Sequence, residues 1–211
     1  HARAQKGRGP RGTARERRPV SALSALPRRA ARMFIDPKAE WLLIAAEDDD
    51  IGSLYSNYIA VLAAVPALSV LAGLALAGGR FLGAAGIATA VTAAVVSYTM
   101  ALASSIILAI VVEKVAPAFK ADGTTSEALK LVAYSSTPVW LGGVCSILIA
   151  LSPLVVIGWL WAIYLFYLGL PVVMKTPHEQ VVPFALVAAL ATVVVSIVLN
   201  AIFTAAGIPH Y

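Results

Sequence analysis

The chain has 211 residues, of which 60% are hydrophobic and 13% are charged. Soluble globular proteins have about 25% charged residues, and the apolar residues here stand in runs long enough to cross a bilayer, so the composition excludes an ordinary soluble domain. The net charge of +5 is unevenly distributed, because residues 1–32 carry +9 and the residues from Met33 onward carry −4.

Residues 1–32 form a basic arm with ten Lys or Arg and one acidic residue, Glu16. The chain starts at His1, and Met33 stands where the composition changes. We therefore expect the arm to be a disordered or non-native extension outside the folded domain, which we place at residues 33–211. A transit peptide and a segment that binds anionic lipid or nucleic acid are the alternatives. The predicted function does not depend on the arm, and we expect no nucleic-acid partner.

Residues 37–47 are predicted to form a short amphipathic helix at the membrane interface. Asp36 is a suitable N-cap, and Pro37 fits the first helical position. Trp41 and its aliphatic neighbours are typical of the membrane–water boundary. The acidic run that follows is either part of a partner-binding face or a solvated turn; consecutive carboxylates project in different directions, so we expect no metal site there. The candidate partner-face residues are Trp41, Glu47, Asp48, Asp49 and Asp50.

Five apolar segments follow, at about residues 58–78, 83–112, 128–150, 154–173 and 181–207. Each approaches or exceeds the roughly 20 residues that a spanning helix needs. The sequence therefore predicts an all-α integral membrane bundle of five transmembrane helices. Lysines flank the spans on one side, whereas the other side has only Arg80, so we expect a cytoplasmic N-terminus and a C-terminus outside.

The second span has a small residue at every fourth position, a pattern that lets a neighbouring helix approach closely. Asn200 is the one strong hydrogen-bonding side chain deep in the last span, and we interpret it as a contact between helices. The predicted helix-packing residues are Ala93, Ser97, Ala101, Ser105 and Asn200.

The third span contains a polar cluster that ends in a proline. Pro138 has no N–H, so in a helix it cannot bond the carbonyl of Tyr134. In hydrocarbon such a carbonyl needs another partner, and the hydroxyls of Ser135, Ser136 and Thr137 are close in sequence. We predict a helix break at Pro138 that faces protein or a polar cavity.

Catalytic and metal-binding patterns are missing from the sequence. There is no His-Glu-x-x-His pair, no Gly-x-Ser-x-Gly elbow and no Gly-rich phosphate loop. Cys145 is the only cysteine, which excludes an internal disulfide and paired-cysteine metal sites. We therefore expect no enzymatic activity, no catalytic residues, no metal and no cofactor.

Three segments of the chain carry a family resemblance: LKLVAYSSTPVWLGG, WLWAIYLFYLGLPVVMKTPHEQ and the lead-in DPKAEWLLIAAEDDDIGSLYSNYI. Together they resemble the bacterial branch of the Yip family of Ypt/Rab-interacting membrane proteins. The resemblance covers about residues 34–203. The family's eukaryotic Gly-Tyr-Gly-x-x-Pro motif corresponds here to Ala133–Pro138, where the tyrosine and the proline match and both glycines are replaced. The residues that the resemblance marks are Tyr134, Ser135, Ser136, Thr137, Pro138, Trp140, Gly169, Pro171, Lys175 and Pro177.

The resemblance implies five spans and a cytoplasmic N-terminus. In eukaryotes the family is associated with prenylated Rab-type GTPases and vesicle traffic, so a Rab-type partner is implied only for a eukaryotic chain. We expect a multi-pass protein of the bacterial cytoplasmic membrane that organises the bilayer or binds other membrane proteins or itself. Its partner face would comprise residues 37–47, 113–127 and 174–180. The alternative is a transporter or channel for a small neutral solute or lipid.

Overall fold

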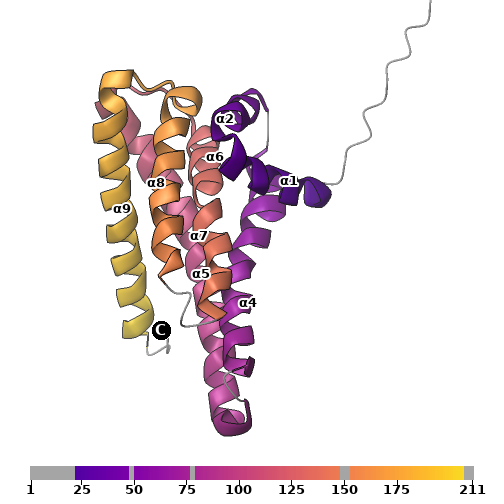
Figure 1. Cartoon of the computed structure of the whole chain (residues 1–211). Helices are drawn as coiled ribbons and strands as arrows, with labels where there is room; N and C mark the ends of the chain where they lie inside the picture. Colours follow the sequence, from indigo (N-terminus) through magenta and orange to yellow (C-terminus); the bar gives the residue numbers. More distant parts are fainter. Residues whose placement is uncertain (1–21, 48–49, 77–78, 148–152, 207–211) are drawn as a thin grey trace, which may run out of the picture.

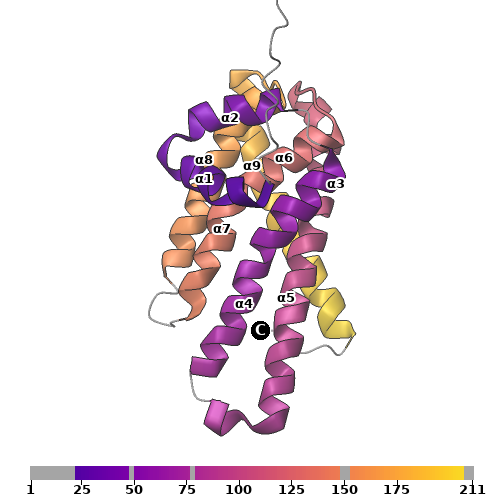
Figure 2. The ribbon, with the colours of Figure 1, turned by 90° about the vertical axis from the view of Figure 1, so that its right-hand side faces the viewer.

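The computed structural model describes residues 22–47, 50–76, 79–147 and 153–206, and within these ranges every regular element is a helix. The predicted all-α class is therefore confirmed. Long helices run side by side, while α1 and α2 lie across one end of the bundle (Figures 1 and 2). Four helices are long and apolar enough to cross a membrane, at Ile51–Gly73, Gly86–Phe119, Leu154–Val173 and His178–Ala205.

The two N-terminal helices are α1 (Ala22–Ile35) and α2 (Pro37–Ala46). The side chain of Asp36 accepts a hydrogen bond from the Ala39 amide at 3.2 Å, which confirms the predicted N-cap of α2. The expected domain boundary before Met33 falls inside α1. Ala30 and Met33 are buried, so the last turns of α1 pack on the bundle, whereas residues 1–21 lie outside the described ranges.

The α2 helix does not have the single apolar face expected of an interfacial helix. Its buried residues are Glu40, Trp41 and Ile44, while the apolar Leu42 and Leu43 are exposed. Trp41 therefore belongs to the core and is unavailable to a partner, which corrects its assignment to the partner face. The ring is buried because the α2 helix packs on α8, which the sequence of α2 alone does not reveal.

The first span is longer than predicted. It begins with α3 (Ile51–Leu54), passes through a π-helical turn at Tyr55–Ile59 and continues as α4 (Ala60–Leu76). The second is α5 (Gly79–Val115), followed by a 3₁₀ turn at Ala116–Phe119. The last two are α8 (Leu154–Val173), as predicted, and α9 (His178–Ala205).

The third apolar segment is divided into short pieces. They are α6 (Thr125–Ser135), α7 (Thr137–Gly142) and a 3₁₀ turn at Gly143–Ile147. A capping box between Thr124 and Glu127 starts α6. The predicted break is confirmed, because α6 ends at Ser135 and α7 restarts with Pro138 in its first turn, where a missing N–H costs nothing.

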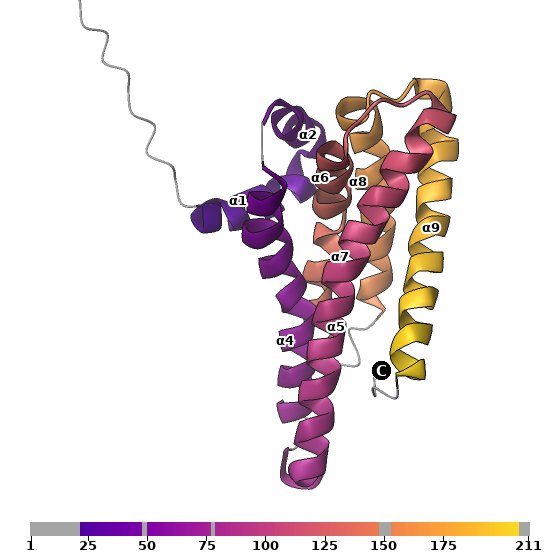
Figure 3. The ribbon, with the colours of Figure 1, turned by 180° about the vertical axis from the view of Figure 1, so that it is seen from behind.

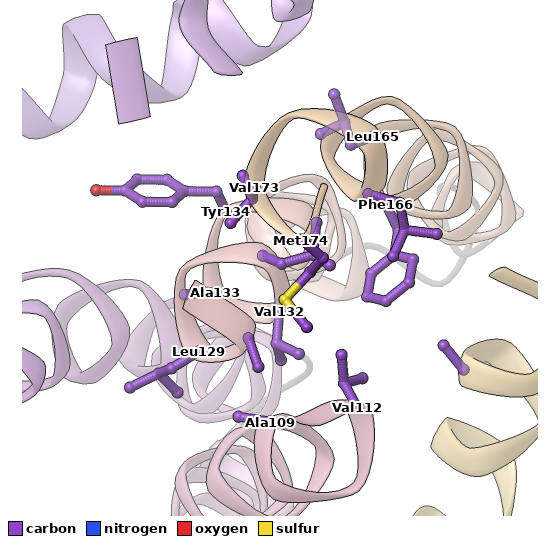
Figure 4. Close-up of a cluster of buried hydrophobic side chains, with 14 of the residues drawn as sticks. Ala109, Val112, Leu129, Val132, Ala133, Tyr134, Leu165, Phe166, Val173 and Met174 are labelled. Atoms are coloured by element: carbon purple, nitrogen blue, oxygen red, sulfur yellow. The ribbon is translucent and has the colours of Figure 1, made fainter. Parts of the chain in front are cut away.

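The core lies where α6 meets α2, α5 and α8. Figure 4 shows apolar side chains of α5, α6 and α8 converging on this centre, among them Val112, Val132 and Phe166. The ring of Tyr134 points away from the cluster, with its hydroxyl toward the N-terminal elements (Figure 4). The core therefore sits near the end of the bundle that α1 and α2 cover.

The α4 and α5 helices form a hairpin that reaches past the ends of α8 and α9, on the side away from α1 and α2 (Figures 1 and 3). Hydroxyls tie the two helices together, because Tyr55 donates to the carbonyl of Leu102 at 3.0 Å and Tyr98 to that of Ala60 at 3.2 Å. Figure 3 shows α5 running obliquely across the back of the bundle toward the start of α9.

Candidate functional site

A cluster of charged side chains lies under α1, at the end of the bundle that the N-terminal helices cover. Arg29 is its centre and uses three nitrogens. Its Nε lies 3.3 Å from Glu40 Oε1, its Nη1 donates to the Tyr134 hydroxyl at 2.8 Å, and its Nη2 pairs with Glu47. The planar guanidinium suits three acceptors held in different directions. One cation thus joins α1 to α2, to the residue after α2, and to α6.

The electrostatics of the cluster depend on burial. The Glu40 side chain is 3% exposed, and Arg32, the second cation beside it at 3.6 Å, is 61% exposed. Arg29 also lies over the Tyr134 ring, with 5.4 Å from its Cζ to the ring centroid. Burial alone would lower the pKa of Arg29, but Tyr134 and the Glu47 carboxylate outweigh it and raise that pKa above its ordinary value. Arg29 is therefore a permanent cation that neutralises a buried carboxylate.

Tyr58 extends this cluster toward the helix break. The π-helical turn at Tyr55–Ile59 aims its ring at α6, where the centroids of Tyr58 and Tyr134 are 4.4 Å apart. The hydroxyl of Tyr58 forms a 2.7 Å hydrogen bond with Thr137 Oγ1, and both side chains are buried. The break between α6 and α7 is thereby tied to the first span.

A second feature of this end is a polar pocket of about 440 Å³. Its walls come from the end of α2, the start of α6 and the end of α8 with the loop that follows. The Asp122 amide donates to the Met174 carbonyl at 2.9 Å, and the Lys130 ammonium contacts the Glu47 carbonyl, so all three walls are linked. The charged residues that line the pocket are Glu47, Asp50, Glu127, Lys130 and Lys175.

A third feature is a larger groove of about 760 Å³ on the side of the bundle between α5 and α9. Its inner wall is formed by α6, α7 and α8. Most of its lining is apolar, with hydroxyl groups of serine and threonine and the amide of Asn200 among them.

The predicted partner-face residues divide into three groups. Glu47 and Asp50 line the polar pocket, although Glu47 is also paired with Arg29 and Asp50 caps α3 through the Gly52 amide at 3.1 Å. Trp41 is in the core. Asp48 and Asp49 lie outside the described residues.

The residues marked by the family resemblance have structural roles around the break. Ser136 donates to the Val132 carbonyl at 2.8 Å, while Ser135 is buried and its hydroxyl has no hydrogen-bond partner among the described residues. Pro138 and Trp140 are buried in α7. The hydroxyls of Ser136 and Thr137 thus bond different partners, and the three hydroxyls do not gather at one carbonyl.

The marked residues of α8 and the following loop shape a tight corner. A Cβ on Gly169 would meet Leu131 at 2.5 Å and Trp41 at 2.8 Å, so a side chain has no room there. Pro171 lies inside α8. Lys175 adopts a left-handed φ of 51°, after which the Thr176 amide reaches the Leu170 carbonyl at 3.3 Å and closes the helix. Pro177 is the N-cap residue of α9.

The predicted helix-packing residues lie together, but along a groove and not in a close helix contact. Because their side chains are small, they leave space between α5 and α9 that no described side chain fills, and Asn200 is exposed. The residues concerned are Ala93, Ser97, Ala101, Ser105 and Asn200.

Sequence reasoning missed the central residues of the charged cluster, Arg29 and Glu40. The sequence does indicate a helix here, because Leu26, Ala30 and Met33 recur at the spacing of a helix face. The many arginines around these residues favoured the interpretation of a disordered arm instead.

The polar pocket and the groove are recessed surfaces of the kind that bind other molecules. Within the described ranges no three His, Cys, Asp or Glu side chains are grouped closely enough to hold a metal ion. The polar pocket presents charges of both signs, which suits a polar protein surface, and the groove presents apolar walls.

Comparison with known proteins gives one match. The family model described as the Yip1 domain matches residues 31–200, which include every described helix from α2 to α8 and most of α9. No curated protein and no solved structure matches the chain.

Proposed function

The chain belongs to the Yip1 domain family of multi-pass membrane proteins, and from this membership we propose that it is a non-enzymatic membrane component that binds partner proteins at the end bearing the polar pocket. The partners are other membrane proteins or a second copy of the chain. The pocket, and not the groove, is the partner site.

We propose five crossings of the bilayer. Four are the long apolar helices, and the additional one, third in chain order, is made by α6, α7 and the 3₁₀ turn that follows. The arrangement of the neighbouring helices supports this topology, because α5 ends at the same end of the bundle as α1 and α2, beside the start of α9, whereas α8 starts toward the other end (Figure 1). The segment between them has to return across the bundle. With Lys38, Lys114, Lys120 and Lys175 all on the covered end, the N-terminus is cytoplasmic and the C-terminus lies outside. The proposed location is the bacterial cytoplasmic membrane.

The observation that carries the proposal is the convergence of three segments on one end. Residues 37–47, 113–127 and 174–180 are far apart in sequence, yet all three contribute to the polar pocket or to the contacts that hold it together. The contacts include Gly123, where a Cβ would come within 2.5 Å of Met174 Sδ. Such close packing holds the loop between α5 and α6 against the loop after α8.

The pocket's residues suit a partner with polar and charged side chains. Lys175 and Asp50 are exposed at its edge, where they can meet opposite charges on a partner. Exposed charges of this kind guide association and specificity more than they contribute affinity.

Site-specific photo-crosslinking in native membranes tests the proposal. A photoreactive amino acid at Lys175 or at Thr124, both exposed at the covered end, should capture the same partner. The matched control is Ala205, exposed at the far end of α9. Partners captured only from Ala205, or different partners from the two test positions, would contradict a partner face at the polar pocket.

A further inference from the structure

The groove between α5 and α9 has the dimensions of a site for a long, slender molecule. Its volume of about 760 Å³ lies within the roughly 300–1,000 Å³ usual for ligand pockets. It extends from Leu108 to Ala93 on α5 and from Ala185 to Asn200 on α9. Fifteen residue steps at about 1.5 Å each give a length of roughly 22 Å along either helix.

The groove exists because its facing positions carry small side chains. Ala93, Ser97 and Ala101 on α5 line one wall, and Ala188 and Ala189 on α9 line the other. Protein interiors are normally packed without voids, so an apolar space of this size in a folded chain is filled by something else. The molecules next to it are lipids, because the outer surfaces of α8 and α9 expose large apolar side chains such as Ile163, Val193 and Ile197.

Two polar groups mark the ends of the groove. At the inner end, Ser135 lines the groove; the residue is 4% exposed, and its buried hydroxyl has no hydrogen-bond partner among the described residues. At the other end lies Asn200, five residues before the end of α9 and so about 7 Å from it. If the end of α9 marks the membrane boundary, the amide lies near the ester groups of the adjacent leaflet.

We propose that the groove binds one acyl chain of a bilayer glycerolipid from the leaflet at the C-terminal end of α9. The lipid's ester groups lie beside Asn200, where the amide can donate a hydrogen bond. The chain runs inward along the small residues of α5 and ends against Trp140 and Ser135. This site is separate from the partner-binding end and does not depend on it.

A helix from a second copy suits the groove less well, because a rigid cylinder about 10 Å across cannot follow the walls inward to the buried Ser135 and Trp140. A single acyl chain is thinner and bends to follow the walls. Burying a methylene group yields about 0.8 kcal/mol when it leaves water but little when it leaves lipid. Binding of the chain therefore rests on close contact and on the ester hydrogen bond.

Photolabelling of the full chain in bilayer nanodiscs tests the site. The probe is phosphatidylcholine with a diazirine near the end of one acyl chain, and labelled residues are mapped by mass spectrometry. Labelling at Ser135 or Trp140, which bulk lipid cannot reach, is the expected result. Val194, on the exposed face of α9, reports annular lipid. Labelling of Val194 without labelling of the two buried positions would overturn the proposal.

A matched pair of variants locates the label. Ala101→Phe fills the groove, whereas Ala88→Phe adds the same ring to an exposed position of α5. The first change should reduce labelling of Trp140 several-fold, and the second should leave it unchanged. Equal effects of the two changes, or crosslinks between two copies through Ala101, would overturn the proposal. The wild-type labelling result stands by itself if the Ala101 variant fails to fold.

Discussion

Replacing Arg29 with methionine removes the nearer and more buried of the two cations beside the Glu40 carboxylate. The methionine keeps much of the apolar stem of arginine, so packing under α1 changes little. What remains is Glu40, 3% exposed, with the solvent-exposed Arg32 as its nearest cation at 3.6 Å. The Tyr134 hydroxyl and the Glu47 carboxylate also lose this partner.

The magnitude follows from burial. Breaking a buried ion pair by removing one member costs about 3–5 kcal/mol, because the other charge stays buried and uncompensated. The pair with Glu47 adds little, since that side chain is 35% exposed and exposed pairs contribute about 0–1 kcal/mol. Because Arg32 retains part of the compensation, we expect a loss of about 3 kcal/mol. In a chain of this length that corresponds to roughly 6–12 °C in apparent Tm.

The assay is thermal unfolding of the purified chain in detergent, followed by tryptophan fluorescence, since Trp41 lies in the core beside Tyr134. Arg28→Met is the matched control, because Arg28 is exposed on the same helix and no pair links it to the cluster. The double variant Arg29→Met with Glu40→Gln should recover most of the lost stability, since no buried charge is then left unpaired.

Equal melting temperatures for Arg29→Met and Arg28→Met would refute the reasoning. So would a double variant that is less stable than Arg29→Met alone. Either result would mean that Arg29 contributes no compensating charge to the fold.

Two further substitutions test the packing around the break. Gly169→Ala should destabilise the chain, because the new Cβ would meet Trp41 at 2.8 Å and overpacking costs about 1–3 kcal/mol, more than the roughly 1 kcal/mol gained in helix propensity. Gly142→Ala, where no atom lies within 4 Å, is its control and should be neutral or stabilising in the same thermal assay. Tyr58→Phe should cost about 1–3 kcal/mol, because the buried hydroxyl of Thr137 loses its 2.7 Å partner. Adding Thr137→Val should restore part of the loss, and no restoration would show that this hydrogen bond is not the source.

Much of the architecture could be predicted from the sequence. Continuous apolar runs indicate helices of membrane length, and α8 coincides with its predicted bounds. Pro138 marked the break, because the loss of an N–H is a local property of the chain. The start of the first span was placed too late, since the polar residues of the π-helical turn interrupt the apolar run although the helix continues.

The site was harder to predict, because its contacts join residues that are distant in sequence. Arg29 and Tyr134 are separated by 105 positions, and no local pattern links them. Trp41 resembled an interfacial residue until its neighbours in α6 and α8 were known. The small residues of α5 were recognised as a feature, but their pattern is the same whether the facing helix packs tightly or stands apart.

The α4–α5 hairpin has a consequence for the membrane itself. Its 37-residue helix α5 is about 55 Å long, whereas the hydrocarbon core is about 30 Å thick. A helix with such an excess has to tilt steeply, emerge from the bilayer or thicken the lipid around it. Since α8 and α9 stop short of the hairpin's tip, the mismatch is confined to one side of the molecule. If the hairpin thickens the lipid beside it, the bilayer is deformed on one side of the protein only, and molecules that share the deformed lipid would attract one another without any contact between their surfaces.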